Sequence, residues 1–346
     1  MTESSKARGG LRALVPSIIA LAFAVCATFA LAGCATSGGA ATTSASSATS
    51  GGAEHKIAMI LDDGINDGGW GASCYNAMVS AAEKLGWDTA YSENLGQSDW
   101  ATALQNYADE GYDLIFAPSD KYEDAVQQVA ADNPDSKFVV LDGDIKSDNI
   151  ESLLPDNRQL GELAGSLAAL LTKTDSVAFI GGVELDTTKQ KQEGFEAAVR
   201  QVNPAAQVTV AYAGSYTDVA KGKELAQSMV SQANVDVIFG DASGVDSGVR
   251  ETLSGQEGRY NIGQPDDLGG ADDPVIANSI VTDNEAMLEE SMKDVENGSF
   301  GNKVIDGDLS SGAIKVGTFS DKIVPKDVQD KFAEIVKQIE AGTFIS

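Results

Sequence analysis

Residues 56–85 read KIAMILDDGINDGGWGASCYNAMVSAAEKL. A short apolar run, 56–61, ends at Asp62-Asp63-Gly64, and from Gly69 to Leu85 the apolar residues recur at helical spacing. A continuous apolar run followed by an amphipathic segment predicts a buried strand followed by a helix. This strand-then-helix unit decides the fold class, because the rest of the chain repeats it.

The repeats fall into two series, separated near Pro155. In the first series, further strands are expected at 89–91, 114–117 and 138–141, and helices around 100–107 and over 122–131. In the second series, strands are expected at 177–180, 208–211 and 235–239, and helices over 160–171, 189–202, 219–231 and 245–253. The strand expected at 276–281 and the helix expected over 284–296 return to the part of the protein formed by the first series, and a terminal helix over 328–339 closes the chain. Apolar strands that alternate with amphipathic helices predict an α/β protein with two parallel sheets, each covered by helices on both faces.

Two sheets imply two lobes, because a domain of nearly 300 residues exceeds what one hydrophobic core usually supports. We expect the first lobe to comprise residues 55–154 plus about 278–305. The second lobe then comprises 155–277 plus about 306–346. Ligands of open α/β sheets bind at the carboxyl ends of the strands. Two such sheets facing each other across a cleft therefore predict a hinged binding protein.

The N-terminal 33 residues have the profile of an export signal: Lys6, Arg8 and Arg12 precede a long apolar run. The run ends at Leu31-Ala32-Gly33-Cys34, which resembles a bacterial lipobox. That resemblance implies a signal peptide of residues 1–33 and a mature N-terminus at Cys34 that carries lipid, palmitate included. The alternative is an uncleaved transmembrane anchor. Either way, the domain is expected outside the cytoplasmic membrane, and residues 34–54, nearly all Ala, Ser, Thr and Gly, form a flexible tether.

Composition excludes most enzyme classes and several partners. Cys74 is the one cysteine of the expected mature domain, so no intrachain disulfide can form. The one histidine, His55, leaves no zinc site and no Ser-His-Asp triad. The net charge of −28 repels nucleic acid and favours a monomer. We therefore expect a non-enzymatic protein without cofactor, metal or nucleic-acid partner.

Six sequence segments together resemble a known protein family. In chain order they are INDGGWGASCYNAM (65–78), KFVVLDG (137–143), LAGSLAALLTKTDSVAFIGG (163–182), EGFEAAVRQVNP (193–204), GSYTDVAKGKELA (214–226) and VDVIFGDASGVDSGV (235–249). Their order and spacing resemble the basic membrane protein family over residues 56 to about 319. The resemblance implies a substrate-binding lipoprotein of an ABC importer, with a two-lobed type I periplasmic-binding fold. Several members of that family bind nucleosides between two aromatic rings.

The same resemblance implies a set of ligand-binding residues. Trp70 and Tyr216 fall at the positions of the two rings, where a flat ligand would gain stacking energy from both. Without the resemblance, Trp70 reads as the first buried residue of its helix and Tyr216 as an ordinary strand end. Asp67 and Asp142 are expected to accept hydrogen bonds from the ligand. Further residues are expected to line the second lobe and the hinge: Ser243, Gly244, Asp267 and Thr282.

The chain departs from the family pattern at three points. Gly71 replaces an asparagine after the first ring. Pro265 stands where the family has the carboxylate that accepts from ribose hydroxyls, so that Asp266 or Asp267 would have to substitute. Thr282 stands where the family has a lysine. These changes favour a binding lipoprotein more strongly than they favour a nucleoside as its ligand.

The sequence thus predicts a lipid-anchored receptor that closes on a nucleoside or a related heterocycle and delivers it to an ABC permease. Two alternatives remain open at this stage. One is a sensory lipoprotein that signals to a membrane receptor, and the other is an importer receptor for a non-nucleoside solute.

Overall fold

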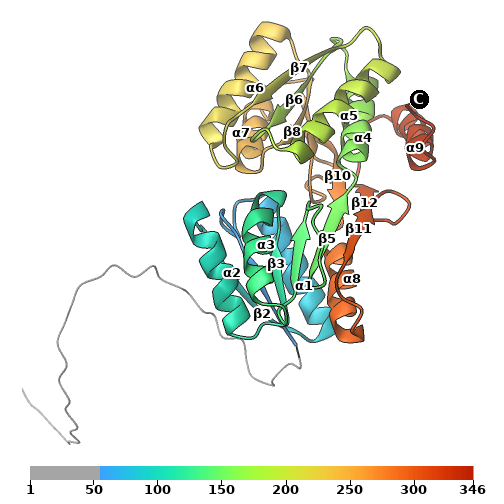
Figure 1. Cartoon of the computed structure of the whole chain (residues 1–346). Coiled ribbons are helices and arrows are strands. Elements are labelled where there is room, and N and C mark those ends of the chain that lie inside the picture. Colours follow the sequence, from blue (N-terminus) through green and yellow to red (C-terminus); the bar gives the residue numbers. More distant parts are fainter. Residues whose placement is uncertain (1–54, 346) are drawn as a thin grey trace, which may run out of the picture. The chain divides into compact units, whose positions relative to one another are not determined.

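The computed structural model describes residues 55–345 (Figure 1). The predictions for the signal peptide, Cys34 and the tether lie outside these residues. Between residues 55 and 345, no helix combines the length and apolar character needed to cross a bilayer.

The first lobe is built on a six-stranded parallel sheet in the order β11-β5-β4-β3-β1-β2. Its strands are β1 (Lys56–Ile60), β2 (Asp88–Ser92), β3 (Leu114–Ala117), β4 (Phe138–Leu141), β5 (Ile150–Pro155) and β11 (Lys303–Gly307). Its helices are α1 (Trp70–Leu85), α2 (Trp100–Asp109), α3 (Glu123–Asp132) and α8 (Asn284–Asn297), with short 3-10 turns at Gln97–Asp99 and Asp120–Tyr122. One hydrophobic cluster joins the sheet to α1 and α8, and another joins its opposite face to α2 and α3.

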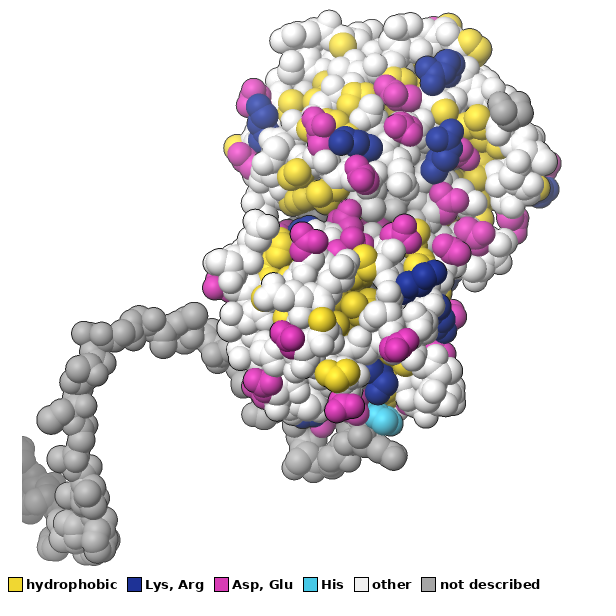
Figure 2. Space-filling model, in the orientation of Figure 1, with side chains coloured by type: hydrophobic (Ala, Val, Ile, Leu, Met, Phe, Trp, Pro, Cys, Tyr) yellow, Lys and Arg dark blue, Asp and Glu magenta, His cyan; other side chains and the backbone are white. Residues whose placement is uncertain are grey.

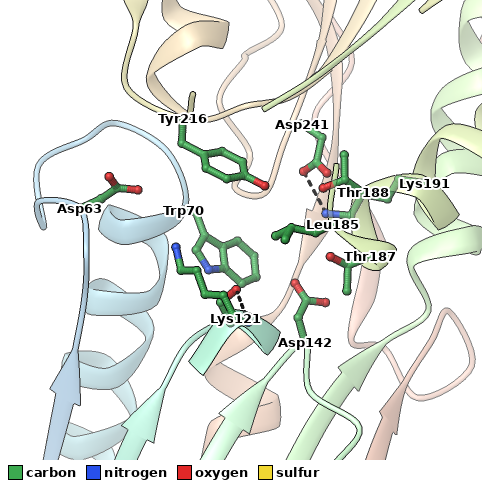
Figure 3. Close-up of a pocket in the computed structure, with 11 residues that line it drawn as sticks. Asp63, Trp70, Lys121, Asp142, Leu185, Thr187, Thr188, Lys191, Tyr216 and Asp241 are labelled. Carbon is green, nitrogen blue, oxygen red and sulfur yellow. Dashed lines mark hydrogen bonds and ion pairs between the residues drawn. The ribbon is translucent and has the colours of Figure 1, made fainter. Parts of the chain in front are cut away.

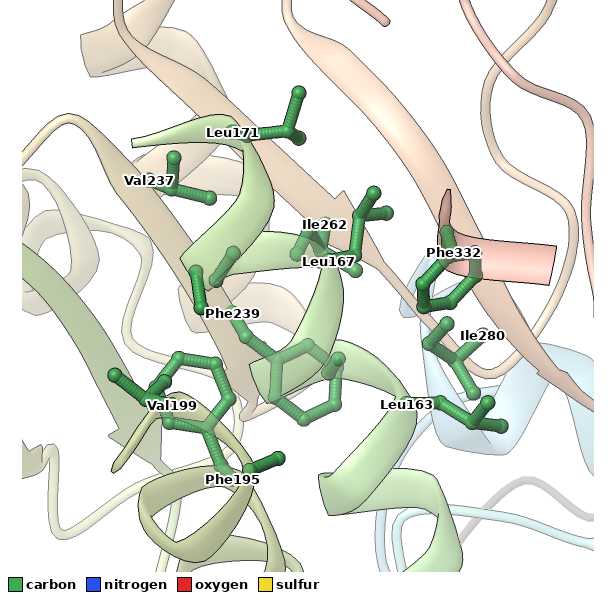
Figure 4. Packing of buried hydrophobic residues seen from close by; sticks show 14 of the residues in the cluster. Leu163, Leu167, Leu171, Phe195, Val199, Val237, Phe239, Ile262, Ile280 and Phe332 are labelled. Carbon is green, nitrogen blue, oxygen red and sulfur yellow. The ribbon is translucent and has the colours of Figure 1, made fainter. Parts of the chain in front are cut away.

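The second lobe repeats this plan in the order β12-β10-β9-β8-β6-β7. Its strands are β6 (Ser176–Gly181), β7 (Gln207–Tyr212), β8 (Val237–Asp241), β9 (Tyr260–Gly263), β10 (Ile276–Thr282) and β12 (Ile314–Val316). Its helices are α4 (Asn157–Leu171), α5 (Asp186–Val202), α6 (Val219–Ala233), α7 (Gly244–Leu253) and α9 (Lys326–Glu340). Helices α4, α5 and α9 cover one face, where Phe195 and Phe239 lie in the core with Leu163 (Figure 4), and α6 and α7 cover the other.

The predicted α/β class is therefore confirmed, with one correction. The edge strand β12 runs antiparallel to β10, so the second sheet is mixed rather than purely parallel. Four strands were not predicted from the sequence: β5, β9, β11 and β12.

The chain passes between the lobes three times, after β5, β10 and β11. The return to the first lobe comes later than the expected boundary near 278. Strand β10 pairs with β9 and β12 in the second sheet, and the crossing follows Thr282. Strand β10 stays in the second sheet because it is an interior strand and almost wholly buried there, so the crossing can come only after its end. Helix α8 then packs beside α1 in the first lobe.

Candidate ligand-binding cleft

A cavity lies between the lobes at the carboxyl ends of the strands. Its empty space is about 480 Å³, part of which is open solvent. The lining residues come from both lobes: Asp63, Trp70, Ser119, Lys121 and Asp142 from the first, and Leu185, Thr187, Thr188, Lys191, Tyr216 and Asp241 from the second. Figure 3 shows the Trp70 and Tyr216 rings on opposite sides of this space.

The first wall is the beginning of α1. The Asp67 carboxylate accepts hydrogen bonds from the backbone N–H groups of Gly69, Gly71 and Ala72, at 2.9, 3.0 and 2.9 Å. It thereby satisfies N–H groups that have no partner within the helix. The Trp70 indole Nε1 donates to the carbonyl oxygen of Pro118 at 2.6 Å, which fixes the orientation of the ring.

The opposite wall is the loop that follows β7 and carries Tyr216. Its ring lies over the backbone of Gly182, just beyond β6, where a Cβ atom would come within 2.3 Å of the ring. A glycine at 182 is therefore required for the tyrosine to pack there. Burial raises the pKa of the Tyr216 hydroxyl, and the nearby Asp241 carboxylate adds to the effect. The ring is thus a neutral surface at any physiological pH.

The polar end of the cavity is formed by Lys191 between two carboxylates. The Lys191 ammonium is 3.0 Å from Asp241, and their side chains are 7% and 15% exposed. Burial alone would lower the pKa of Lys191, but the carboxylates of Asp241 and Asp142 outweigh it and hold that pKa above its usual value. Burial raises the pKa of Asp142, an effect that Lys191 and a hydrogen bond from Asn157 oppose. Lys191 therefore carries a positive charge in the cleft.

Backbone geometry fixes the position of both groups. Asp142 follows β4 with a φ of 60°, a left-handed conformation that aspartate tolerates, and it receives the Asn157 side chain at 2.9 Å. Helix α5, which carries Lys191, packs directly on α4. A Cβ at Gly161 would meet the Lys191 carbonyl oxygen at 2.0 Å, and one at Gly194 would meet that of Arg158 at 2.3 Å. The two helices touch through their backbones, so Lys191 is held on a rigid support.

The rim of the cleft carries a second lysine. The Lys121 ammonium lies 2.7 and 2.6 Å from the two oxygens of Asp62, which also accepts a hydrogen bond from the Tyr122 hydroxyl at 2.8 Å. The same ammonium is 5.8 Å from the centre of the Tyr216 ring in the second lobe. Figure 2 shows acidic side chains on the visible surface of both lobes, several of them near the junction.

The lobes also touch directly beside the cavity. The backbone N–H of Trp70 donates to Ser243 Oγ at 3.1 Å, and Ser73 Oγ donates to Asp266 at 2.8 Å. At Gly69, a Cβ would lie 2.6–2.8 Å from atoms of Ser243. The backbone of the first lobe thus approaches the second as closely as glycine permits.

The structure brings three of the eight expected ligand residues to the cavity: Trp70, Asp142 and Tyr216. Ser243 lies at the contact between the lobes, and Gly244 donates its N–H to the Tyr216 carbonyl oxygen at 2.8 Å. The other three lie outside the cavity lining: Asp67, Asp267 and Thr282. The two oxygens of Asp267 accept from the N–H and hydroxyl of Thr318 at 2.6–3.0 Å, and Thr282 is buried at the end of β10.

The sequence did contain signals for two residues that were missed. Asp241 directly follows the apolar run of β8, as Asp142 follows β4, and the carboxyl end of a strand is where a ligand residue is expected. Lys191 is four residues before the buried Phe195, on the apolar face of α5. A lysine at such a position indicates either a buried ion pair or a ligand-binding site. Among residues 55–345, no group of three or more histidine, cysteine or acidic side chains is arranged to hold a metal ion.

Comparison with known proteins agrees with this architecture. The family described as "ABC transporter substrate-binding protein PnrA-like" (Bmp) matches residues 54–345. The chain is 32% identical to the "ABC transporter nucleoside-binding protein BmpA" of Lactococcus lactis, over 69% of this chain and 67% of that protein. It is 25% identical to the "Transcriptional activator protein med" of Bacillus subtilis, over 82% and 87% of the respective chains.

Among solved structures, the chain resembles a solute-binding protein of an ABC transporter system from Aeropyrum pernix. The TM-score is 0.70 at 22% identity, over 84% of this chain and 81% of the other. At this identity the likeness concerns the fold, and it confirms the two-lobed periplasmic-binding architecture.

Proposed function

This chain belongs to the Bmp family of PnrA-like ABC transporter substrate-binding proteins, and on that premise we propose that it is the lipid-anchored, extracytoplasmic receptor of an importer for a nucleoside or related heterocycle. The fold supports a solute-binding role, since both sheets present their carboxyl ends to one cavity. The relative from Lactococcus lactis is named for nucleoside binding. The N-terminal sequence ending in Cys34 supports the anchor.

The observation that carries the ligand assignment is the pair of rings. Trp70 comes from the first lobe and Tyr216 from the second, and both line the cavity. A planar ligand between them would be covered on both faces, with about 0.5–1.5 kcal/mol from each aromatic pair beyond the burial of area. Because the rings belong to different lobes, this sandwich is complete only when the lobes are closed. Ligand binding would therefore stabilise the closed form.

The polar residues have separate roles in this proposal. Asp142 accepts a hydrogen bond from the ligand. Asp67 holds the start of α1 and so positions Trp70, while Ser243 joins the lobes and Gly244 positions the Tyr216 loop. Asp267 holds Thr318 within the second lobe, and Thr282 ends β10, where the chain crosses to the first lobe, both outside the cavity.

The test is a calorimetric and thermal-shift screen of residues 54–346 against nucleobases, nucleosides, sugars and amino acids. We expect saturable binding of bases or nucleosides, with weaker binding by Trp70→Ala and near-normal binding by Trp70→Phe, which keeps a ring. Stabilisation by sugars or amino acids alone would remove the stacking roles and the heterocycle assignment.

A sensory role is a second candidate, since one relative is named as a transcriptional activator. The two functions differ in what the cell loses when the gene is deleted. An importer receptor is required for uptake of radiolabelled ligand, whereas a sensor is required for a transcriptional response and leaves uptake unchanged. Loss of uptake on deletion, restored by the wild-type gene, is the result that we expect.

A further inference from the structure

The polar end of the cavity contains a buried cation with unused hydrogen-bonding capacity. An ammonium group has three N–H donors and no acceptor. Lys191 makes one hydrogen bond among the described residues, to Asp241, although its side chain is only 7% exposed. Lys191 also lines the cavity, so its remaining donors can be reached from the position of a ligand.

The carboxylates on either side of Lys191 also retain free acceptors. Asp142 receives one hydrogen bond, from Asn157, and Asp241 receives two, from Lys191 and Gln264, both on the same oxygen. An ionised carboxylate has several acceptor positions and no donor. Figure 3 shows Asp142 rising from the first lobe, with the Lys191–Asp241 pair on the second lobe. One end of the cavity is thus lined by a hydrogen-bond donor, Lys191, and by two hydrogen-bond acceptors, Asp142 and Asp241.

We infer that Lys191 is a specificity-determining residue that donates to a carbonyl oxygen of the ligand, while Asp142 and Asp241 accept from ring N–H groups beside it. This inference rests on the proposed function, because it assumes a heterocycle between the two rings. It predicts that the site selects oxo-substituted heterocycles over their amino-substituted counterparts. An exocyclic amino group would place donors against the Lys191 donors, and the ammonium would lose the acceptor that an oxo group offers.

The hydrogen bonds of the Asp267 carboxylate support recognition of the ligand through its base rather than through a sugar. This aspartate lies close to the position at which the family pattern has the ribose-binding carboxylate, but its oxygens are engaged by Thr318. Its near neighbour Asp266 is engaged by Ser73. Neither carboxylate lines the cavity. The carboxylates that do line the polar end of the cavity are those beside Lys191.

A purely structural ion pair is the competing explanation for Lys191, and the test separates the two. Calorimetry would measure the affinity of the wild-type domain for two pairs of probes, hypoxanthine with adenine and inosine with adenosine. Each pair differs mainly by an oxo or amino group on the six-membered ring. We expect the oxo member of each pair to bind at least tenfold more tightly.

Lys191→Met should remove this preference, and Lys189→Met is its matched control. Lys189 is on the same helix, but its side chain is 46% exposed and lies 4.0 Å from Glu184, so its removal should leave the preference unchanged. Since Lys191→Met leaves two buried carboxylates without a cation, the double variant Lys191→Met/Asp241→Asn restores the balance of charge. It should unfold cooperatively and also lack the preference.

Equal affinities within each probe pair for the wild type, or an oxo preference that persists in the double variant, would overturn the role of Lys191 while leaving a heterocycle receptor intact. If none of the four probes binds and a sugar or amino acid does, the heterocycle assignment and this inference both fail.

Discussion

Replacement of Gly69 by alanine should hinder closure of the cleft without disturbing either lobe. Gly69 belongs to the first lobe, and the atoms that its Cβ would meet belong to Ser243 of the second lobe, at 2.6–2.8 Å. Distances below 3.0 Å are not tolerated by a Cβ, so the backbones must move apart. The collision exists only when the lobes are closed, because opening separates the two residues.

The magnitude follows from two contributions. Forcing an extra methyl group into a well-packed contact costs roughly 1–3 kcal/mol. The hydrogen bond from the Trp70 N–H to Ser243 Oγ, at 3.1 Å, is stretched or lost at the same time, which costs about 0.5–1.5 kcal/mol. Part of the strain is relieved by slight opening, so we expect a net loss of about 1–3 kcal/mol in binding, or roughly 5- to 150-fold in Kd.

The assay combines calorimetry with small-angle X-ray scattering, using the heterocycle that binds most tightly in the screen. Wild-type protein should contract on saturation, and Gly69→Ala should contract less and bind more weakly, while its ligand-free melting temperature changes little. Gly255→Ala is the control, because a Cβ there meets nothing within 4 Å. Wild-type affinity and full contraction in Gly69→Ala would refute the idea that tight binding requires this contact between the lobes.

Three further predictions follow from individual residues. Trp70→Ala should weaken binding of a base or nucleoside by roughly 2–4 kcal/mol, through lost stacking and lost burial; calorimetry checks this, and an unchanged Kd would exclude Trp70 from the site. Burial raises the pKa of Asp246 to about 7. Since this folded-state pKa is above the unfolded one, its contribution to stability is present below about pH 4 and lost as the pH rises through 7, by up to about 4 kcal/mol. In urea unfolding, the free energy of unfolding of Asp246→Asn should therefore rise relative to that of the wild type between pH 4 and pH 8. A difference that stays constant over this range would contradict the raised pKa. Cys34→Ser should abolish labelling by a fatty-acid analogue and leave the precursor uncut, because only a thiol forms the thioether; a mutant that is still labelled would disprove the lipoprotein assignment.

Much of the fold could be predicted because apolar runs mark buried strands directly. The runs at Leu114–Ala117 and Phe138–Leu141 coincide with β3 and β4. Strand β5 was missed because its interior contains Glu151 and Ser152, both fully buried. Glu151 is satisfied by Ser291 Oγ at 2.6 Å and by the N–H of Gly301 at 2.8 Å, partners that are remote in sequence. Tertiary hydrogen bonds of this kind leave no local pattern.

The same limit applies to the cleft. The family resemblance predicts Trp70, Asp142 and Tyr216 as ligand residues, and all three line the cavity. For Lys191, the sequence shows a lysine on an apolar helical face, which indicates a buried ion pair or a ligand site but does not identify its partners. Lys191 lies on α5, Asp241 at the end of β8 and Asp142 in the other lobe, so only the folded chain brings the three charges near one another.

The central claim is that the two lobes close on a flat heterocycle, and the solute retained by the native protein tests it most directly. Mass spectrometry of the small molecules released on denaturing the domain, after purification without added ligand, should identify a base, a nucleoside or a closely related oxo-heterocycle in stoichiometric amount. Stoichiometric recovery of a sugar, an amino acid or a peptide, bound in a manner that Trp70→Ala does not weaken, would contradict the account.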